Sequence, residues 1–521
     1  MLKKRNMSLN IYPCKKIQEG YNERCGLPQN SKIQETEPMD KKNLALLNDF
    51  YEYTMASGFM KAGIADRIAY FDIFFREVPD DGGYVIAAGL DEIINYVKDF
   101  HFDEDDIQYL RDQNCFDEAW LESLKDFRFT GDIYAVPEGT VVFPGEPLLT
   151  VRARTVEAQI LETFLLLCIN HQSLIATKSN RIVRAAQGRP VMEFGARRAH
   201  GASAAYYGAR ASYIAGCAGT SCTLTGKDYD IPALGTMAHS WVQIFDDEYT
   251  AFKTYCEQYP QNACLLIDTY DVLNSGLPNA MRAFKEVLWP MGVHKCSVRI
   301  DSGDLAYLTR RTREILDENG LQECKIVISN ALDEYLITDL IAQGGCVDSF
   351  GVGERLITAK SDPILGGVYK LAAIEDADGV IHPRIKISEN VIKITTPHFK
   401  KIYRLYDKET GKAIADQICV YDEIIDESRP LVIFDQHNPW KRKTIENFTA
   451  RELMKPIFLG GKLVYDAPSM KEIRDYCAKE VDSLWDEVKR FENPHGYYVD
   501  LSQKLYDIKT ELLYEGSNHK E

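Results

Sequence analysis

Two segments of the chain, about fifty residues apart, combine cations, carboxylates and glycines in a pattern suited to a phosphorylated sugar. The first reads Val-Arg-Ile-Asp-Ser-Gly-Asp and places Arg299, Asp301 and Asp304 around a tight turn. The second reads Ser-Phe-Gly-Val-Gly-Glu-Arg, and its backbone N–H groups at Gly351 and Gly353 can approach a phosphate closely. Carboxylates that bind Mg²⁺ or sugar hydroxyls, beside such a phosphate site, predict a phosphorylated sugar as ligand. The alternative for the first segment is an exposed turn with a surface salt bridge. The alternative for the second is a tight turn at the end of a strand.

Two further segments add candidate catalytic and binding side chains. His239 ends a Gly-Thr-Met-Ala-His segment that also contains Thr236, where it can serve as an acid, a base or a phosphate acceptor. A lone histidine is more often a structural residue. Glu193 and Arg197 belong to a Glu-Phe-Gly-Ala-Arg-Arg segment, and Arg181 lies upstream on a predicted helix. The carboxylate of Glu193 and the two guanidiniums of Arg197 and Arg198 predict either a pocket for an anionic substrate or an internal ion-pair network, and Arg181 could point to the same place.

The candidate residues follow a series of short apolar runs that we interpret as strands. These predicted strands are residues 191–194, 233–236, 264–267, 297–300, 325–329 and 349–352. Predicted helices at 277–288, 305–318 and 333–343 separate several of them. A repeat of roughly 25–35 residues is typical of βα units and predicts a parallel α/β barrel. Such barrels hold their active sites at the carboxyl ends of the strands, where Ser329 joins the other candidates.

Changes in pattern divide the chain into four parts. Residues 1–38 are polar and of mixed charge, which predicts a disordered tail. Residues 39–155 combine helical periodicity with turn-rich strands and predict an N-terminal α+β domain. The predicted barrel occupies residues 156–380 and begins with a long helix. Residues 381–521 predict a β-rich and helical appendage that packs on the other two parts.

The bulk composition excludes several classes of partner. The 521 residues carry a net charge of −17, which argues against nucleic acid and anionic membranes because both need a basic surface. No apolar run approaches the roughly 20 residues of a membrane span, and no apolar segment typical of a signal peptide follows the N-terminus. Thirteen scattered cysteines without a Cys-x-x-Cys pair favour a reducing cytoplasm. We therefore expect a cytoplasmic globular protein.

Ordered motifs spread over roughly residues 43–480 form a recognisable set. They read Asn-Asp-Phe-Tyr-Glu-Tyr-Thr-Met-Ala from residue 48, Phe-Asp-Ile-Phe-Phe-Arg from 71, Glu-Phe-Gly-Ala-Arg-Arg-Ala from 193, Gly-Thr-Met-Ala-His-Ser from 235, Asp-Thr-Tyr-Asp from 268 and Ser-Gly-Leu-Pro-Asn-Ala from 275. The Arg299 and Gly351 segments and Gly-Gly-Val-Tyr-Lys from residue 366 complete the set. In this combination the chain resembles the nicotinate phosphoribosyltransferase family of type II phosphoribosyltransferases.

The resemblance implies an enzyme that joins nicotinate to 5-phosphoribosyl 1-diphosphate, giving nicotinate mononucleotide and diphosphate in the first step of NAD salvage from nicotinate. The family couples ATP hydrolysis to this transfer, which places it among the ligases, and its phosphorylated histidine corresponds to His239. Thr236 and Arg299 correspond to residues that contact nicotinate. The family fold is an irregular α/β barrel with an N-terminal β-containing domain. It forms homodimers in which the tyrosine matching Tyr51 stacks on nicotinate in the neighbouring subunit's site.

The chemistry of this reaction suits the candidate residues. Mg²⁺ and cationic side chains stabilise the leaving diphosphate, while Asp301 and Asp304 hold the ribose and support its positive charge. An arginine selects the acid over its amide because an unpaired guanidinium is costly beside a neutral ring. One departure from the family is Glu354, which stands where threonine often binds the phosphate. This carboxylate repels a phosphate unless it turns away or pairs with Arg355.

Three other interpretations remain open from the residues. A nicotinamide phosphoribosyltransferase of the sister family would prefer the amide. An unrelated phosphate-binding barrel enzyme, such as an aldolase, would need a Schiff-base lysine or a metal cluster at the rim, and the sequence offers neither. A non-catalytic NAD-pathway binding protein is disfavoured by the presence of His239, Arg299, Asp301 and Asp304 together.

Overall fold

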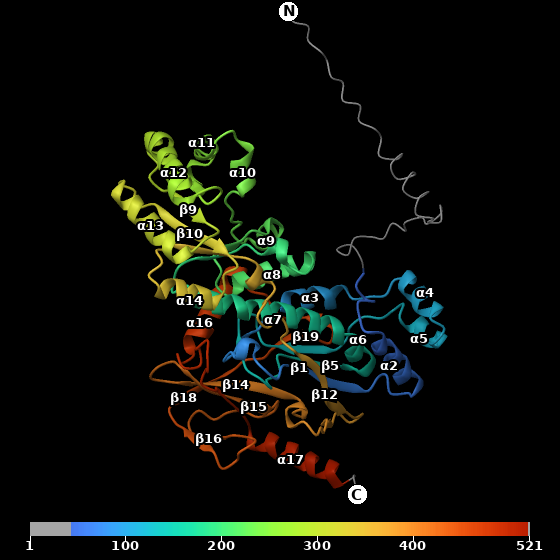
Figure 1. Ribbon diagram of the computed structural model, residues 1–521. Helices are drawn as coiled ribbons and strands as arrows, with labels where there is room; N and C mark the ends of the chain where they lie inside the picture. The colour runs from blue at the N-terminus through green and yellow to red at the C-terminus, as the bar shows by residue number, and fades with distance from the viewer. Residues whose placement is uncertain (1–42, 519–521) are drawn as a thin grey trace, which may run out of the picture. The chain divides into compact units, whose positions relative to one another are not determined.

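A six-stranded parallel sheet carries most of the candidate residues (Figure 1). The computed structural model describes residues 43–518, so the tail predicted at 1–38 lies outside the described residues. In spatial order the strands are β7 (Gly219–Thr220), β6 (Val191–Glu193), β11 (Ser349–Val352), β10 (Lys325–Asn330), β9 (Ser297–Ile300) and β8 (Cys264–Leu266). Every neighbouring pair is parallel, so all the carboxyl ends lie at one edge of the sheet.

Five of the six predicted strands are confirmed, and two of them, β9 and β11, have the predicted bounds. The predicted strand at 233–236 forms only an isolated parallel bridge, from Ala233 to Thr220 of β7. β7 itself was not predicted, because two residues are too few to produce a period-2 pattern. This bridge continues the parallel order beyond β7.

Helices separate the parallel strands. They are α8 (Ala202–Ile214), α9 (Thr223–Tyr229), α10 (His239–Ile244), α11 (Glu248–Gln258), α12 (Leu277–Ala283), α13 (Leu305–Glu318), α14 (Glu334–Ala342) and α15 (Glu354–Ile357). Asp304 and Asp333 cap α13 and α14, each accepting a backbone N–H three residues on, at 3.0 and 2.9 Å. The predicted helix at 277–288 is interrupted after Ala283 by a π-helical turn, Phe284–Leu288.

One long helix links the parallel sheet to the rest of the structure. The predicted helix beginning at 156 is two helices, α6 (Thr155–Ile160) and α7 (Glu162–Ala185), which meet at Leu161. In Figure 1, α7 runs between the parallel strands and the antiparallel strands β1, β5 and β12. Because it is covered on several sides, its buried residues include the charged Lys178 and Arg181.

A seven-stranded antiparallel sheet joins residues from all three predicted regions after the tail. Its order is β13 (Ile381–Pro383), β12 (Val368–Glu375), β1 (Ile68–Phe74), β5 (Leu149–Arg154), β3 (Asp132–Ala135), β19 (Lys455–Leu459) and β20 (Lys462–Leu463). Two short strands, β2 (Val85–Ile86) and β4 (Val141–Val142), pair beside it. Residues from Ala45 onward accordingly form one compact unit.

Short helices complete the N-terminal part. They are α2 (Phe50–Lys61), α3 (Leu90–Asp99), α4 (Glu104–Asp112) and α5 (Glu118–Ser123). Helix α2 begins at Phe50, directly after Asp49, whose backbone is extended. None of the helices within residues 43–518 combines the length and the apolar character needed to cross a membrane.

The C-terminal region is β-rich and helical, as predicted. A four-stranded sheet has the order β18 (Phe448–Glu452), β14 (Lys400–Asp407), β15 (Ala413–Val420) and β21 (Tyr498–Leu501). Strands β16 (Leu431–Phe434) and β17 (Arg442–Ile445) pair beside it, and the helices are α16 (Met470–Ser483) and α17 (Gln503–Asn518). With its parallel sheet, N-terminal α+β part and β-rich appendage, the structure confirms the predicted α/β class.

Candidate active site

A cavity of about 200 Å³ opens at the carboxyl edge of the parallel sheet. Seven predicted site residues line it: Arg197, Arg299, Asp301, Ser329, Gly351, Gly353 and Glu354. Phe194, Arg198, Asn330 and Ala331 complete the lining. The seven residues come from segments up to 157 positions apart in the chain, between Arg197 and Glu354. They meet because β6, β9, β10 and β11 are parallel neighbours whose following loops lie at the same edge.

Cations outnumber unpaired carboxylates around this cavity. Arg197, Arg198 and Arg299 face two carboxylates, Asp301 and Glu354. Glu354 is paired with the ammonium of Lys360, 2.6 Å from its Oε1, and this contact holds the pKa of Glu354 below its ordinary value. The cavity therefore has the local charge to attract an anion despite the net charge of −17.

The glycine turn is shaped by a neighbouring aromatic ring. A Cβ added at Gly351 would lie 2.6 Å from Cδ2 of Phe194, so any larger residue would displace the ring. Gly353 comes two residues later, directly before α15, and a Cβ there would lie 3.0 Å from the Phe194 carbonyl oxygen. Both glycines line the cavity, at positions where a side chain would crowd Phe194.

Arg299 connects β9 to the loop before α10. Its Nη1 donates to the Thr236 hydroxyl, and its Nη2 donates to the Met237 carbonyl at 2.9 Å. Its Nε is buried and makes no hydrogen bond within the described residues. The guanidinium is therefore held in place by two of its five N–H donors, while Nε is shielded from solvent.

His239 lies between a hydroxyl and a carboxylate. Its Nδ1 is 3.2 Å from Oγ1 of Thr269, and its Nε2 is 4.0 Å from Oδ2 of Asp301. The histidine and aspartate side chains are 40% and 39% exposed, so both can reach a bound ligand. His239 is not among the cavity-lining residues, and this contact with Asp301 joins it to the cavity.

Asp301 is fixed by two neighbouring strands. The Ser329 hydroxyl at the end of β10 donates to its Oδ1 at 2.5 Å. Its backbone N–H donates to Oδ2 of Asp268 at 3.0 Å, and the Ser302 hydroxyl donates to the same oxygen at 2.6 Å. Asp268 follows β8, so the position of the Asp301 carboxylate depends on three adjacent strands.

Comparison with known proteins identifies the family. Family models match three stretches of the chain: the NAPRTase N-terminal domain over residues 46–170, the nicotinate phosphoribosyltransferase (NAPRTase) family over 190–393 and the nicotinate phosphoribosyltransferase C-terminal domain over 399–509. The chain is 42% identical to a nicotinate phosphoribosyltransferase of Bacillus subtilis, an alignment that covers 91% of this chain and 96% of the relative.

The chain belongs to the nicotinate phosphoribosyltransferase family.

Further relatives agree with this assignment. The chain is 33% identical to nicotinate phosphoribosyltransferase 2 of Arabidopsis thaliana, over 89% of this chain and 93% of that protein. The crystal structure of human nicotinic acid phosphoribosyltransferase superposes with a TM-score of 0.78 at 28% identity, covering 90% of this chain and 100% of the human chain. A nicotinate-nucleotide pyrophosphorylase from Pyrococcus furiosus shares the fold with a TM-score of 0.66 at 23% identity, over 87% and 98% of the two chains.

The predicted site residues Asp304, Glu193 and Arg181 do not line the cavity. Asp304 is exposed and uses its Oδ1 to cap α13. Glu193 is fully buried at the end of β6, where it accepts from the Thr220 hydroxyl at 2.6 Å and from the Gly195 N–H, and burial raises its pKa. Arg181 lies in a buried ion-pair network on α7. Their substrate-binding or catalytic roles stay predictions.

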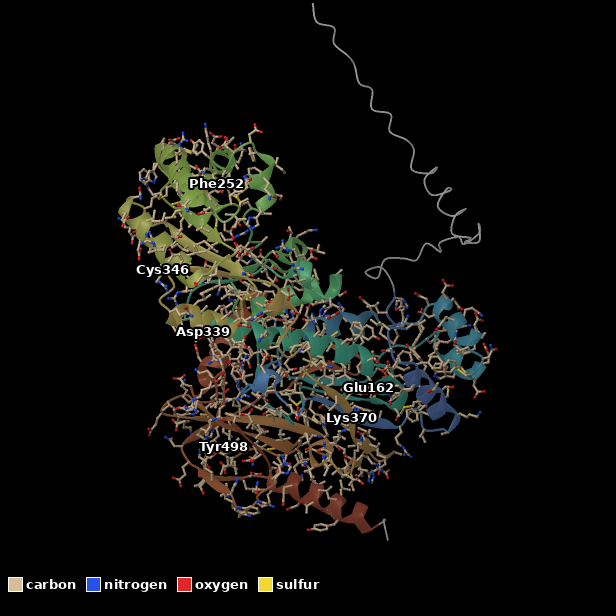
Figure 2. The ribbon with its side chains drawn as sticks, viewed as in Figure 1. Glu162, Phe252, Asp339, Cys346, Lys370 and Tyr498 are labelled. Atoms are coloured by element: carbon tan, nitrogen blue, oxygen red, sulfur yellow. The ribbon has the colours of Figure 1, made fainter. Side chains whose placement is uncertain are left out.

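Tyr51 lies on α2, which Figure 1 shows on the opposite side of the ribbon from α10, where His239 lies. It is 43% exposed, and its pKa is raised by partial burial and by the carboxylate of Glu162. Figure 2 labels Glu162 and Lys370 close together, and their charged atoms lie 3.7 Å apart. Tyr51 is thus partly exposed and does not line the cavity.

The cavity offers limited protein ligation for the Mg²⁺ that the family resemblance implies. Asp301 presents a partly exposed carboxylate there, whereas within residues 43–518 no group of three metal-binding side chains gathers. This fits Mg²⁺, which commonly binds one or two carboxylates and takes its other ligands from substrate phosphates and water. Asp301 is the residue that would hold it.

Sequence reasoning gave no role to several residues of this site. Thr269 contacts His239, and Asp268 fixes Asp301. Both residues follow β8, in the Asp-Thr-Tyr-Asp motif that contributed only to the family resemblance. Asn330 adopts a φ of 141° at the end of β10, which is unusual for a residue other than glycine. A position at the end of a parallel strand, or a few residues beyond it, was the signal available for all three.

Proposed function

We propose that this protein transfers the phosphoribosyl group of 5-phosphoribosyl 1-diphosphate to nicotinate, forming nicotinate mononucleotide and diphosphate with coupled hydrolysis of ATP. The observation that carries the proposal is the cationic cavity, in which a glycine turn, Arg299 and Asp301 meet at one sheet edge. The catalytic, substrate and cofactor roles that follow are parts of this proposal, as is the cytoplasmic location expected from the cysteines.

The cavity residues position the sugar for a substitution at its anomeric carbon. The 5-phosphate binds the backbone N–H groups at Gly351 and Gly353 with help from Arg197, while Asp301 faces the ribose. The pyridine nitrogen donates its lone pair to the anomeric carbon as the bond from that carbon to the diphosphate oxygen breaks, and diphosphate leaves with the electron pair. Mg²⁺, when bound, neutralises charge on the diphosphate oxygens. Positioning and electrostatic stabilisation account for catalysis, because the nucleophile needs no deprotonation.

Selection of nicotinate depends on Arg299. Its guanidinium is held by Thr236 and the Met237 carbonyl, with Nε left without a partner. The remaining Nη N–H groups, rather than the buried Nε, offer donors to the nicotinate carboxylate. Nicotinamide places a neutral amide there, so the positive charge of Arg299 is less well compensated.

ATP coupling depends on His239. Its Nε2 attacks the terminal phosphorus of ATP, ADP leaves with the electron pair of the broken bond, and water later releases phosphate from the histidine. The exposure of the imidazole and its contacts with Thr269 and Asp301 support this role, because a phosphate acceptor needs one accessible ring nitrogen and a fixed orientation.

The dimer proposal is supported by the surface of α2. Four large apolar side chains of this twelve-residue helix are more than a third exposed: Phe50, Tyr51, Met55 and Met60. An exposed apolar group of this size is typical of a protein–protein contact. We place Tyr51 on the nicotinate ring in the site of a second subunit.

One assay tests the reaction as a whole. Diphosphate and ADP are measured in the same mixture while nicotinate, phosphoribosyl diphosphate and ATP are omitted in turn. We expect diphosphate release to require both nicotinate and phosphoribosyl diphosphate, and to rise when ATP is added. Diphosphate release that is independent of nicotinate would contradict the proposal.

A further inference from the structure

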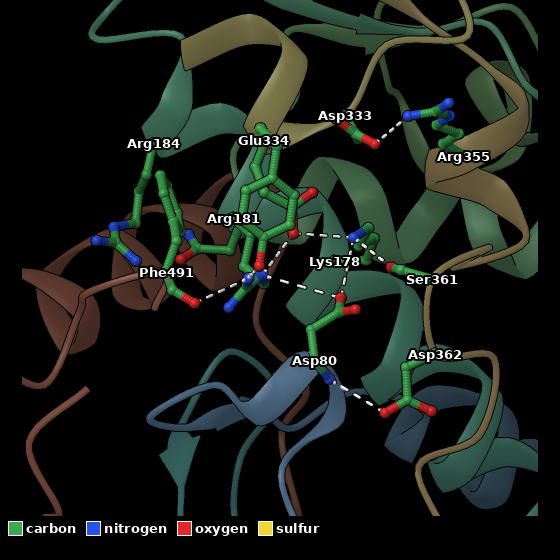
Figure 3. Close-up of polar contacts among 12 residues, drawn as sticks. Asp80, Lys178, Arg181, Arg184, Asp333, Glu334, Arg355, Ser361, Asp362 and Phe491 are labelled. Atoms are coloured by element: carbon green, nitrogen blue, oxygen red, sulfur yellow. Dashed lines mark hydrogen bonds and ion pairs between the residues drawn. The ribbon is translucent and has the colours of Figure 1, made fainter. Parts of the chain in front are cut away.

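A buried network of charged residues lies beside the proposed phosphate-binding turn. Figure 3 shows Lys178 at its centre, with acceptors arriving from three other segments of the chain. The Nζ of Lys178 lies 2.9 Å from Oδ2 of Asp80, 2.9 Å from Oε1 of Glu334 and 2.7 Å from Oγ of Ser361. An ammonium has three N–H donors, so each of them is used. The side chain is only 3% exposed, which leaves it no contact with a substrate.

Glu334 is the second centre of the network. It is fully buried, and its Oε1 also accepts from Nε of Arg181 at 2.7 Å. The cations Lys178 and Arg181 therefore balance the carboxylates Asp80 and Glu334. A buried network of this kind is strongly destabilised when one partner loses its charge, because the remaining charges stay desolvated.

The network holds two loops that line the cavity. Glu334 lies three residues after Ala331 in the loop that follows β10. Ser361 lies eight residues after Gly353 in the segment that follows β11. Lys178 contacts both, so it ties the two loops to α7 and to each other.

Two more contacts fix the segment that follows the glycine turn. Arg355 donates to Asp333, the neighbour of Glu334, and so holds the start of α15. The backbone N–H of Asp80 donates to Oδ2 of Asp362 at 3.1 Å and holds the other end of the segment. Asp80 keeps a left-handed backbone with a φ of 56°, a conformation that persists in non-glycine residues when neighbouring contacts enforce it.

We propose that Lys178 and Glu334 are positioning residues that hold the Gly351–Gly353 turn in the geometry needed to bind the substrate phosphate. This inference rests on the proposed function for the identity of the substrate. Neither residue touches the ligand. They act through residues 353–362 and 331–334, whose positions they fix.

The test compares two buried glutamates that each accept hydrogen bonds from two cationic side chains. Glu334 accepts from Lys178 and Arg181, and Glu480 on α16 accepts from Arg404 and Arg451 at 2.9 and 2.6 Å. Glu334→Gln and Glu480→Gln remove the same charge with the same change of shape. We expect Glu334→Gln to raise the KM for phosphoribosyl diphosphate about tenfold, the size of effect that such networks carry, without changing the KM for nicotinate. Glu480→Gln should change neither. Equal KM values for phosphoribosyl diphosphate in the two variants would overturn the inference.

A binding measurement separates this inference from the proposed reaction. Calorimetric titration with ribose 5-phosphate needs no turnover and reports on the phosphate turn alone. Weaker binding in Glu334→Gln but not in Glu480→Gln supports the positioning role, even if the wild-type protein forms no nicotinate mononucleotide. Equal affinity in all three proteins refutes it. If Glu334→Gln does not fold, Ser361→Ala is the substitute, because it removes only one contact of Lys178. This variant should also bind ribose 5-phosphate more weakly than the wild type. Unchanged binding in Ser361→Ala refutes the positioning role.

Discussion

At the scale of single residues, the site depends on side chains that are held by neighbours while one atom stays available. Arg299 uses two of its five N–H donors within the protein, and His239 has contacts near both nitrogens yet remains partly exposed. Asp301 is fixed through Ser329 and Asp268. This arrangement lowers the cost of ordering the site when substrates bind.

Replacing His239 with alanine should abolish the stimulation by ATP while a weak transfer activity remains. The reason is that the imidazole accepts phosphate but does not take part in the bond change at the sugar. The measurement is the rate of nicotinate mononucleotide formation with and without ATP. His294→Ala, an exposed histidine elsewhere, is the control and should respond to ATP like the wild type. Equal stimulation in His239→Ala and wild type would refute the role.

Replacing Arg299 with glutamine should lower kcat/KM for nicotinate by about 100-fold and leave the low value for nicotinamide nearly unchanged. The substitution removes the charge that pairs with the carboxylate but keeps a polar group near Thr236. Arg313→Gln is a suitable control, because Arg313 contacts the carbonyls of Leu321 and Cys324 away from the cavity. A loss of the same size for both substrates would show that Arg299 only supports the fold.

At the scale of elements, local patterns predicted the strand ends but not the partners of residues on helices. Arg299, Ser329 and Gly351 could be placed at the rim because each directly follows or ends a short apolar strand. Arg181 could not, because its partner Glu334 is 153 positions away and no local spacing indicates which face of α7 meets α14. The pairing of β3 with β19 was hidden for the same reason.

The packing of α2 should depend on pH through Glu52. This carboxyl accepts from the N–H and hydroxyl of Thr163, and its Oε2 is buried without a hydrogen bond within the described residues. Burial raises the pKa of Glu52 from 4.5 to about 8. The folded state therefore favours the protonated form, and the stability it contributes is complete below pH 4.5 and is lost as the pH rises through 8.

Glu52→Gln should remove this dependence. We expect the free energy of unfolding of the wild type to fall between pH 5 and pH 8 relative to the variant, by at most about 1.4 kcal/mol per pH unit. Urea unfolding at several pH values measures the difference. The exposed Glu122→Gln serves as the control and should run parallel to the wild type. Parallel curves for Glu52→Gln and wild type would contradict the assigned protonation.

At the scale of the whole molecule, residues from Ala45 onward form one compact unit in which strands distant in sequence share sheets. The seven-stranded sheet contains strands from all three regions predicted after residue 38. The family motifs predicted residues of the cavity, but no motif indicated the buried network around Lys178. That network is seen only in the structure. At this scale the main proposal is a dimer in which Tyr51 of one subunit completes the site of the other.

Mixing two impaired variants tests the shared site. Tyr51→Ala and Arg299→Gln should each have little activity alone, the first through a raised KM for nicotinate. In a mixed dimer, one site receives an intact Arg299 from one subunit and an intact Tyr51 from the other. We expect random exchange of subunits to restore up to about a quarter of the wild-type activity. No recovery, despite mixed dimers confirmed by mass spectrometry, would place Tyr51 outside the neighbouring site.

The most direct test of the central claim is a competition between the two pyridines. Equal concentrations of nicotinate and nicotinamide are incubated with the protein, phosphoribosyl diphosphate, ATP and Mg²⁺, and the two mononucleotides are separated and quantified. A cavity that selects a carboxylate through Arg299 predicts nicotinate mononucleotide in excess by about 100-fold or more. Nicotinamide mononucleotide as the main product, or neither mononucleotide, would contradict the account.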